Sequence, residues 1–287
     1  MRIVVTGSAG YIGSDFVTHL RDQYRARFQV LEIDLASNGE DVSSVETRNK
    51  IEDFKPQIIF NFAGISGEKA CRERPHEAFL TDCLAPWRLA GLGVPLLVQA
   101  STLSILDKGD SRYARYKGSA EVHLETAGVP VLCLRFGTLL GSSAAGPEHM
   151  RWDLPVHKMV LDAVTQGVIT IPREPLMRPW LLLGHLRRVL VGVALDAERS
   201  IVPAGFTLQP LVSFNASLEQ VARRVARRVQ LKTGKPVTID YAVGHKDLRS
   251  YASPAVCGTT PGHCSQCELE SVVEDCITLY RTGTLAD

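Results

Sequence analysis

The chain has 287 residues, of which 45% are hydrophobic and 22% are charged. This composition is typical of a folded globular protein, and it excludes a disordered chain, a coiled coil and a fibre. Lysine and arginine number 32 against 31 aspartates and glutamates, so the net charge of +1 offers no field that would attract nucleic acid or an anionic membrane. No apolar stretch is long enough to span a bilayer, and the first residues predict a strand instead of a signal peptide. We therefore expect a cytoplasmic protein whose seven cysteines are reduced.

Strand and helix patterns alternate through the first half of the chain. Short apolar runs predict strands over residues 2–6, 28–34, 57–63, 95–102 and 129–135. Apolar residues at helical spacing predict helices over residues 11–24, 45–54, 77–92 and 111–127. Near-continuous apolar strands that alternate with helices are typical of a parallel sheet covered on both faces. The predicted fold class is α/β, with a Rossmann-type doubly wound sheet.

The pattern becomes less regular after a loop at residues 141–147, whose sequence Gly-Ser-Ser-Ala-Ala-Gly-Pro favours a domain boundary. We expect a dinucleotide-binding domain over residues 1–145. Residues 146–287 are expected to form a smaller, mainly substrate-binding region, parts of which return to the sheet. Helical patterns follow at residues 161–166, 185–195, 217–229 and 269–280. The third of these begins with a Ser-x-x-Gln capping-box pattern at Ser217.

Three glycines follow the first expected strand, at Gly7, Gly10 and Gly13, in the sequence Thr-Gly-Ser-Ala-Gly-Tyr-Ile-Gly. A glycine-rich loop turns sharply and lets the backbone approach a pyrophosphate. It then opens a helix, here at Tyr11 and Ile12, whose N-terminal N–H groups and dipole attract phosphate. The loop therefore predicts that these five residues bind a dinucleotide.

An acidic residue stands at the end of the second expected strand, where Asp34 lies 21 residues after Gly13. A carboxylate in this position accepts hydrogen bonds from a ribose 2′-hydroxyl and repels a 2′-phosphate. The glycine loop and this acid together predict that the site takes NAD in preference to NADP.

Tyr113 and Lys117 lie four residues apart in an expected helix, so their side chains project from one face. The preceding strand ends at Thr102, at the carboxyl edge of the sheet, where open α/β sheets bind ligands. A hydroxyl, a phenol and an ammonium that converge there form a proton-transfer set. We expect the charge of Lys117 to lower the pKa of the Tyr113 phenol, and Thr102 to hydrogen-bond the reacting oxygen.

The glycine loop, its acid and the Tyr113, Lys117 and Thr102 set resemble the extended short-chain dehydrogenase/reductase family, in its nucleotide-sugar epimerase and ketoreductase branch. This resemblance implies catalysis by those three residues, with Lys117 and Tyr113 also contacting the cofactor. It implies further cofactor contacts along the chain, from Asp41 and Val42 near the adenine and from Phe62, Ala63 and Gly64 beneath the cofactor.

The resemblance also implies a substrate site. Arg178-Pro179-Trp180 resembles the arginine-bearing turn that meets the diphosphate of a nucleotide sugar, and residues 247–251, which include Arg249, resemble a late pattern of the family. Ser104 and His157 are the other expected substrate contacts. The implied substrate is a nucleotide-diphosphate sugar. Because helices of such domains often pair, a homodimer is a possible assembly beside the monomer.

Two departures from the family bear on the reaction. Tyr113 follows Thr102 by only eleven residues, a shorter loop than is usual. Leu103 and Ser104 stand where sugar dehydratases of this family carry an Asp-Glu pair that provides acid and base, and this argues against dehydration. We expect an NAD-dependent epimerase that acts at a sugar carbon, with C4 as the first choice. The alternatives are an NAD(P)H-dependent keto-sugar reductase and a non-catalytic dinucleotide sensor or scaffold.

A cluster of cysteines lies near the end of the chain, at Cys257, Cys264, Cys267 and Cys276. Thiolates of this kind can hold zinc tetrahedrally, but strong zinc patterns contain two Cys-x-x-Cys pairs and this segment contains one. The sequence therefore favours ordinary packing of the thiols, and no metal is expected.

Overall fold

The computed structural model describes residues 1–106, 111–242 and 265–282, except for the side chains of 265–267 and 282. The chain divides into two compact units. The first unit contains Met1–Arg135 and Arg187–Gln209, and the second contains Phe136–Leu186 and Pro210–Asp287. The first unit ends before the expected boundary at residue 145, because the next strand, β6 (Thr138–Leu140), pairs with a strand of the second unit.

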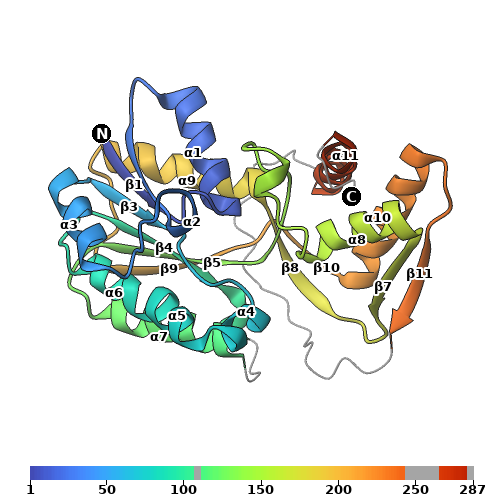
Figure 1. Ribbon diagram of the computed structural model, residues 1–287, viewed down its shortest axis with the longest axis horizontal. Coiled ribbons are helices and arrows are strands. Elements are labelled where there is room, and N and C mark those ends of the chain that lie inside the picture. Colours follow the sequence, from blue (N-terminus) through green and yellow to red (C-terminus); the bar gives the residue numbers. More distant parts are fainter. Residues whose placement is uncertain (107–110, 243–264, 283–287) are drawn as a thin grey trace. The chain divides into compact units, whose positions relative to one another are not determined.

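A six-stranded sheet forms the centre of the first unit (Figure 1). Its strands are β1 (Arg2–Thr6), β2 (Gln29–Ile33), β3 (Ile58–Asn61), β4 (Leu97–Thr102), β5 (Val131–Phe136) and β9 (Phe206–Leu211), in the order β2-β1-β3-β4-β5-β9. The pairs β1–β2, β1–β3 and β3–β4 are parallel. The chain leaves β1 for the edge strand β2 and returns to β3 on the other side of β1. The carboxyl ends of β1 and β3 therefore flank the topological switch point at which such sheets bind ligands.

Helices cover both faces of this sheet (Figure 1). One face carries α1 (Tyr11–Tyr24) and α9 (Leu183–Glu198), and the other carries α3 (Val45–Phe54), α6 (Ala85–Ala90) and α7 (Arg112–Glu125). Strand residues such as Val4 and Ile59 pack with Ile51 of α3 and Leu124 of α7 in one buried cluster. The predicted doubly wound sheet is confirmed, and the near-continuous burial of its central strands explains why their sequences lack alternation.

The expected helix over residues 77–92 differs in detail. It consists of α5 (Pro75–Ala78), a π-helical turn η1 (Phe79–Leu84) and α6, with Ala85 N–H donating to the carbonyl of Leu80, five residues earlier. Pro86 explains the difference, because a proline ring inside an α-helix clashes with the carbonyl four residues earlier, which is that of Asp82. The wider turn avoids this clash, and π turns of this kind often occur at functional sites.

Shorter helices complete the first unit. They are α2 (Leu35–Asn38), α4 (Glu68–Glu73) and the 3₁₀ turn η2 (Leu103–Leu106), which follows β4.

The second unit contains two small sheets and three helices in its described part. The strands are β6, β7 (Val168–Pro172), β8 (Met177–Leu182), β10 (Phe214–Ser217) and β11 (Thr238–Ala242), arranged as β10-β8-β6 and β11-β7. The helices are α8 (Pro155–Gln166), α10 (Leu218–Thr233) and α11 (Ser265–Thr282), preceded by the 3₁₀ turn η3 (Pro147–His149). The capping box predicted at Ser217 is confirmed, with Gln220 as its reciprocal partner.

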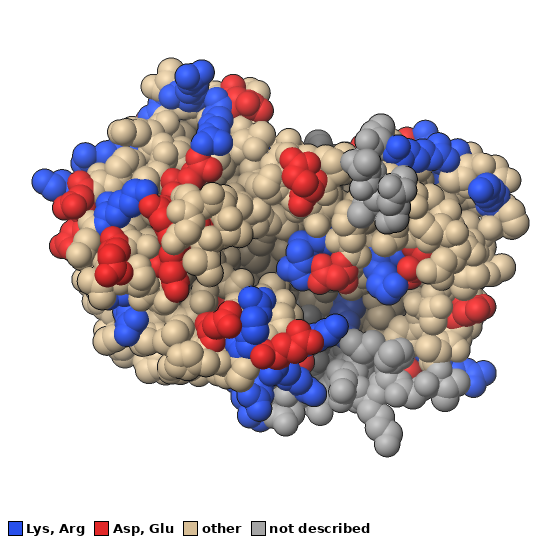
Figure 2. Space-filling view, viewed as in Figure 1, with Lys and Arg blue, Asp and Glu red and all other residues tan. Residues whose placement is uncertain are grey.

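The charged side chains follow the balanced composition. On the face shown in Figure 2, lysines and arginines alternate with aspartates and glutamates over both units. Among the described residues, no helix combines the length and the apolar character that crossing a membrane would require.

Candidate active site

The glycine loop connects β1 to α1 at the switch point of the sheet. Gly7 has a φ of 67°, and a Cβ there would lie 2.6 Å from the backbone nitrogen of Ala63. A Cβ on Gly13 would lie 2.1 Å from the carbonyl oxygen of Gly7, whereas one on Gly10 would lie 3.2 Å from the same atom. Gly7 and Gly13 are therefore required sterically, because the loop, the helix and the segment after β3 approach each other through their backbones.

The loop is fixed by its own amides. Gly7 N–H and Ser8 N–H donate to the carbonyl of Ile33 at 2.8 and 3.4 Å, at the end of β2. Helix α1 begins directly after the loop at Tyr11, with Ile12 in its first turn, so the positive end of the helix dipole lies here. The hydroxyl of Ser8 is buried and has no hydrogen-bond partner within the described part of the chain. An unsatisfied buried donor beside a helix N-terminus fits the phosphate oxygens of a dinucleotide.

Asp34 connects this loop to the next helix. One carboxylate oxygen accepts from the N–H groups of Ala36 and Ser37 at the start of α2, and the other accepts from Ala9 N–H at 3.0 Å. A carboxylate offers about four lone-pair sites, so Asp34 keeps capacity for ribose hydroxyls. The loop, the dipole and this acid together fit NAD, with Asp34 as the residue that would meet the adenosine ribose.

The two residues expected near the adenine have local structural roles. Asp41 accepts a hydrogen bond from Ser43 N–H at 2.7 Å, and Val42 is buried in the apolar cluster between the sheet and α3. Val42 is therefore a core residue. That Asp41 or Val42 contacts the adenine remains a prediction.

The segment Phe62, Ala63 and Gly64 follows β3 and lies against the end of β1. Phe62 N–H donates to the Thr6 carbonyl at 3.1 Å, and Ala63 N–H donates to the Thr6 hydroxyl at 3.4 Å. A Cβ on Gly64 would lie 2.5 Å from a carboxylate oxygen of Asp82 and 3.1 Å from the ammonium nitrogen of Lys117. The structure thus brings this segment together with the glycine loop and with Lys117.

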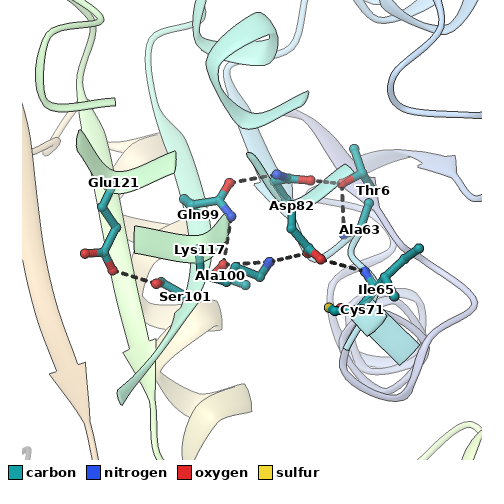
Figure 3. Close-up of polar contacts among 11 residues, drawn as sticks. Thr6, Ala63, Ile65, Cys71, Asp82, Gln99, Ala100, Ser101, Lys117 and Glu121 are labelled. Atoms are coloured by element: carbon teal, nitrogen blue, oxygen red, sulfur yellow. Dashed lines mark hydrogen bonds and ion pairs between the residues drawn. The ribbon is translucent and has the colours of Figure 1, made fainter. Parts of the chain in front are cut away.

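A chain of buried polar side chains crosses the strand ends (Figure 3). The Thr6 hydroxyl donates to Asn61 at 2.5 Å, Asn61 donates to Gln99 at 2.7 Å, and Gln99 donates to the Ala100 carbonyl at 2.7 Å. Lys117 of α7 donates to that same carbonyl at 3.4 Å. The strands β1, β3 and β4 are therefore linked by side chains at this edge, and the chain of bonds leads from Thr6, directly before the glycine loop, to Lys117.

Helix α7 holds Tyr113 and Lys117 in place. Its N-cap is Ser111, whose hydroxyl accepts from Ala114 N–H and donates to Glu68 of α4 at 2.7 Å. Tyr113 is half-buried, and Lys117 is 6% exposed. The Lys117 ammonium forms an ion pair of 3.0 Å with Asp82 of the π turn η1. Lys117 thus belongs to a buried, charged cluster at the carboxyl end of the sheet, and Tyr113 lies one turn before it on the same helix.

The pKa of Tyr113 differs from the sequence-based expectation. Burial raises the pKa of this phenol; Lys117 lowers it, Asp82 raises it, and a hydrogen bond with the Ser66 side chain lowers it, with a net result above the ordinary value. Lys117 lowers the pKa of the phenol as expected, but this effect is outweighed, so the net pKa does not move towards neutrality. The reason is first the burial of the phenol and then the charge of Asp82, neither of which sequence spacing reveals.

The pKa values of Lys117 and Asp82 are also shifted by their neighbours in this cluster. Burial lowers the pKa of Lys117, but the carboxylate of Asp82 and the Tyr113 phenol raise it, and the net pKa lies above the ordinary value. Burial raises the pKa of the Asp82 carboxyl by more than Lys117 lowers it. The ammonium therefore keeps its proton.

Thr102 and Ser104 engage each other at the end of β4. The Thr102 hydroxyl accepts from Ser104 N–H and donates to the Ser104 hydroxyl, both at 3.1 Å. Thr102 is 7% exposed. The pair is on the same strand end as Ala100, which accepts from Lys117, but the direct partners of Thr102 are within its own turn.

The two expected substrate residues of the second unit have different environments. The His157 imidazole is fully buried; its Nε2 accepts from Gly141 N–H at 3.1 Å and its Nδ1 faces the Arg151 carbonyl at 2.8 Å. Because both nitrogens are used, this histidine holds two loops together and has no exposed edge for a substrate. Arg178 lies in β8, where it pairs in register with Ala216 of β10.

The late part of the expected site falls outside the described residues: Arg249, Cys257 and Cys264 lie there, and the side chain of Cys267 is also not described. Cys276 of α11 is a buried free thiol, and burial raises its pKa to about 12. In the part of the chain that the structure describes, no three histidine, cysteine or acidic side chains form a metal-binding group.

Sequence reasoning missed Ser8, Ser66 and Asp82. Ser8 was visible as a hydroxyl within the glycine loop, and Asp82 as an acid four residues before a helix-disrupting proline. Neither signal is specific by itself, because the burial that gives these groups their importance is a tertiary property.

Comparison with known proteins gives two results. The family model described as NAD dependent epimerase/dehydratase family matches residues 3–152, which is more than half of the chain. A comparison with curated proteins gives no match.

Solved structures share the fold across nearly the whole chain. MoeE5, in complex with UDP-glucose and NAD, is 21% identical with a TM-score of 0.75, covering 96% of this chain and 98% of that chain. TunA, an NAD-dependent NDP-hexosamine 5,6-dehydratase of tunicamycin biosynthesis, is 17% identical with a TM-score of 0.76, covering 100% and 99%. UDP-glucuronic acid 4-epimerase from Bacillus cereus, in complex with UDP-glucuronic acid and NAD, is 18% identical with a TM-score of 0.75, covering 98% and 100%.

These similarities agree with the glycine loop, the acid and the Tyr113 and Lys117 pair. The chain belongs to the NAD-dependent epimerase/dehydratase family, and it is an NAD-dependent enzyme of the extended short-chain dehydrogenase/reductase type.

Proposed function

We propose that this enzyme is an epimerase of a nucleotide-diphosphate sugar and that it inverts C4 of the sugar. The observation that carries the proposal is the cluster of Tyr113 and Lys117 at the carboxyl ends of the strands, beside the glycine loop. Similar folds bind UDP-glucose and UDP-glucuronic acid together with NAD, and one of them is a 4-epimerase. The C4 assignment rests on that similarity.

The chain's own residues handle the proton. The phenolate form of Tyr113, which the Lys117 ammonium stabilises, removes the proton from a sugar hydroxyl and becomes a phenol, and it later returns that proton and becomes a phenolate again. Thr102 orients the reacting oxygen. To do so, its hydroxyl would have to give up its hydrogen bond to Ser104 and donate to the substrate instead. NAD, when bound, accepts a hydride from the sugar carbon and can give it back. Arg178 is proposed to bind the diphosphate on the basis of its sequence resemblance, since a guanidinium fork matches phosphate oxygens.

A keto-sugar reductase is the second candidate, and one observation favours it. The raised pKa of Tyr113 keeps the phenol protonated at neutral pH, as a residue that donates a proton to a ketone requires. Dehydration is less well supported, because residues 103–106 directly after Thr102 contain no carboxylate that could serve as acid and base.

The decisive experiment is native mass spectrometry of the purified enzyme, followed by identification of any released cofactor. Retained NAD supports the epimerase, because that cycle regenerates its oxidised cofactor. An enzyme that takes NADH or NADPH only when it is added supports the reductase. A protein that binds NAD but changes neither cofactor absorbance nor any nucleotide sugar would be a sensor or scaffold, and both enzymatic proposals would fail.

Tyr113→Phe tests the role of the phenol. Loss of proton transfer lowers turnover by about 10²–10⁴-fold. NAD affinity should change little, since the glycine loop and Asp34 are intact. Full turnover in this variant would rule out Tyr113 as the acid and base. Tyr116→Phe, which removes the hydroxyl of a tyrosine whose ring contacts Phe79 of η1, is the matched control.

A further inference from the structure

Asp82 is a charged residue of the site to which the proposed reaction gives no task. Its side chain is fully buried, and it comes from the π turn η1, while Lys117 comes from α7. One of its oxygens forms the 3.0 Å ion pair with Lys117, and the other accepts from Ile65 N–H at 3.2 Å. Its carboxylate therefore connects the lysine to the segment after β3, as Figure 3 shows.

The lysine is held from two sides. Its ammonium donates to the Ala100 carbonyl on the β4 side and pairs with Asp82 on the other. The position of Gly64 shows that this pair lies directly against the backbone of the Phe62–Gly64 segment. A side chain at residue 64 would occupy the space of the ion pair, so the absence of one lets the charges approach the cofactor segment.

We propose that Asp82 is a positioning residue for this site: its carboxylate fixes the ammonium of Lys117 and neutralises part of the positive charge that Tyr113 meets. The inference rests on the proposed function of Tyr113 and Lys117. It assigns to a third residue the control over whether Tyr113 is a phenol or a phenolate. With Asp82 in place, part of the positive charge that favours the phenolate is neutralised. Without that negative charge, the unopposed ammonium favours the phenolate.

Several other titratable groups face this cluster. Cys71 of α4 raises the pKa of Tyr113, and Cys133 of β5 raises that of Lys117. Cys83 follows Asp82 within η1. Glu68 of α4 accepts from Tyr113 N–H at 3.3 Å. Burial raises the pKa of Cys71 to about 11, and burial also raises the pKa values of Cys83 and Cys133, so all three thiols stay neutral over the working range. Asp82 is thus the buried carboxylate that contacts the lysine directly.

The test is a spectrophotometric titration of Tyr113 in the intact protein with Asp82→Asn. This substitution keeps the size of the side chain and an acceptor for Ile65 N–H, and it removes the charge. The ionisation of Tyr113 is isolated by subtracting the titration of the matching Tyr113→Phe protein in each background. We expect the fraction of ionised Tyr113 at a fixed alkaline pH to rise several-fold in Asp82→Asn. An unchanged titration would overturn the proposal.

Asp15→Asn is the matched control. Asp15 is a buried carboxylate of the same unit that pairs with Arg187 at 3.0 Å, and it belongs to α1 instead of η1. Its loss should leave the Tyr113 titration unchanged. An equal rise in both variants would show a general effect of lost charge and would refute a specific role for Asp82. Asp82→Glu restores the charge and is expected to titrate close to the unaltered protein.

A second measurement does not depend on a folded variant at position 82. In the unaltered protein labelled with ¹³C at the tyrosine rings and at the aspartate carboxyl carbons, the signal of Tyr113 is assigned by its loss in Tyr113→Phe. Because the two groups share Lys117, the Tyr113 signal should shift when Asp82 takes up its proton at acid pH. A flat Tyr113 signal through the titration of the Asp82 carboxyl carbon would contradict the coupling.

The two proposals can fail separately. A Tyr113→Phe enzyme with full turnover would refute the proposed function, while the phenol titration could still show the effect of Asp82. Conversely, an Asp82→Asn protein with an unshifted Tyr113 and an unshifted pH profile of kcat would refute the positioning role and leave the epimerase proposal intact.

Discussion

Buried polar side chains occur in both compact units, and their arrangements differ. In the first unit, hydrogen bonds run from Thr6 through Asn61 and Gln99 towards the Lys117 and Asp82 pair. In the second unit, His157 bonds Gly141 and Arg151, and His185 faces the Ser213 hydroxyl at 2.9 Å. The former set crosses several strands at one edge of the sheet, whereas the latter consists of separate local contacts.

This contrast shows how a buried polar group can be interpreted. A neutral group whose donors and acceptors are all used by nearby loops is a structural element, and His157 is of this kind. The carboxyl edge of the first unit's sheet contains a buried ion pair and a hydroxyl without a hydrogen-bond partner. Burying such groups lowers the stability of the fold, and local contacts do not offset the loss, so their presence points to a ligand site. The predictions below test this distinction.

The largest effect is expected from Gly13→Ala. The new Cβ would lie 2.1 Å from the Gly7 carbonyl oxygen and 2.8 Å from the Ser8 Cα, so the loop must shift away from α1. We expect NAD affinity, measured by calorimetry, to fall by about 100-fold or more, which corresponds to at least about 2.7 kcal/mol. Gly10→Ala, whose Cβ has 3.2 Å to the same oxygen, is the control and should lose less. Equal affinities of the two variants would contradict the steric argument.

Glu121→Gln tests a buried ion pair of the first unit that lies outside the site. Glu121 accepts three hydrogen bonds from Arg135, at 3.0, 3.2 and 2.5 Å, and one from the Ser101 hydroxyl at 2.5 Å. Removing one partner of a buried pair leaves the other charge uncompensated, so the free energy of unfolding should fall by about 3 kcal/mol. Denaturant titration measures this loss. The Tyr113 titration should stay the same, and a shift there would show that the two ion pairs of α7 form one unit.

His157→Gln tests the structural interpretation of the second unit. Burial lowers the pKa of His157 below 6.5, so the unfolded state takes up a proton before the folded state does. The contribution of this residue to stability is therefore complete above about pH 6.5 and is lost as the pH falls below it, by at most about 1.4 kcal/mol per pH unit. His157→Gln should be less stable by about 1–3 kcal/mol near neutral pH and should lack this part of the acid dependence. NAD affinity should stay unchanged, and a large loss of it would contradict the distinction between the units.

The smallest effect is expected from Arg223→Ala in the second unit. Arg223 pairs with Glu219 one turn earlier on the exposed face of α10, at 2.6 Å. Exposed pairs of this kind are screened by water and salt, so the melting temperature should stay within the error of the measurement. A clear decrease, insensitive to added salt, would mean that this face of α10 is covered in solution.

Much of the first unit could be predicted because its signals are local. The strand at 2–6 and the helices at 11–24 and 45–54 have the predicted bounds, since apolar periodicity and glycine or serine N-caps mark them directly. The helix predicted at 77–92 contains a π turn, because Pro86 conflicts with the carbonyl of Asp82 and periodicity does not report such a clash. The second unit has fewer residues that mark the ends of helices and strands. Its helix ends were therefore predicted less accurately, as at α8.

Local sequence patterns were sufficient to predict the doubly wound sheet, the glycine loop with Asp34, and the spacing that sets Tyr113 and Lys117 on one face of α7. These follow from backbone conformation and helical geometry, which neighbouring residues control. Three properties became evident only in the folded chain: the contact of Asp82 with Lys117, the raised pKa of Tyr113, and the complete burial of His157. Burial and the approach of charges from distant segments set these properties, because desolvation and Coulomb energy depend on position in space and not on spacing along the chain.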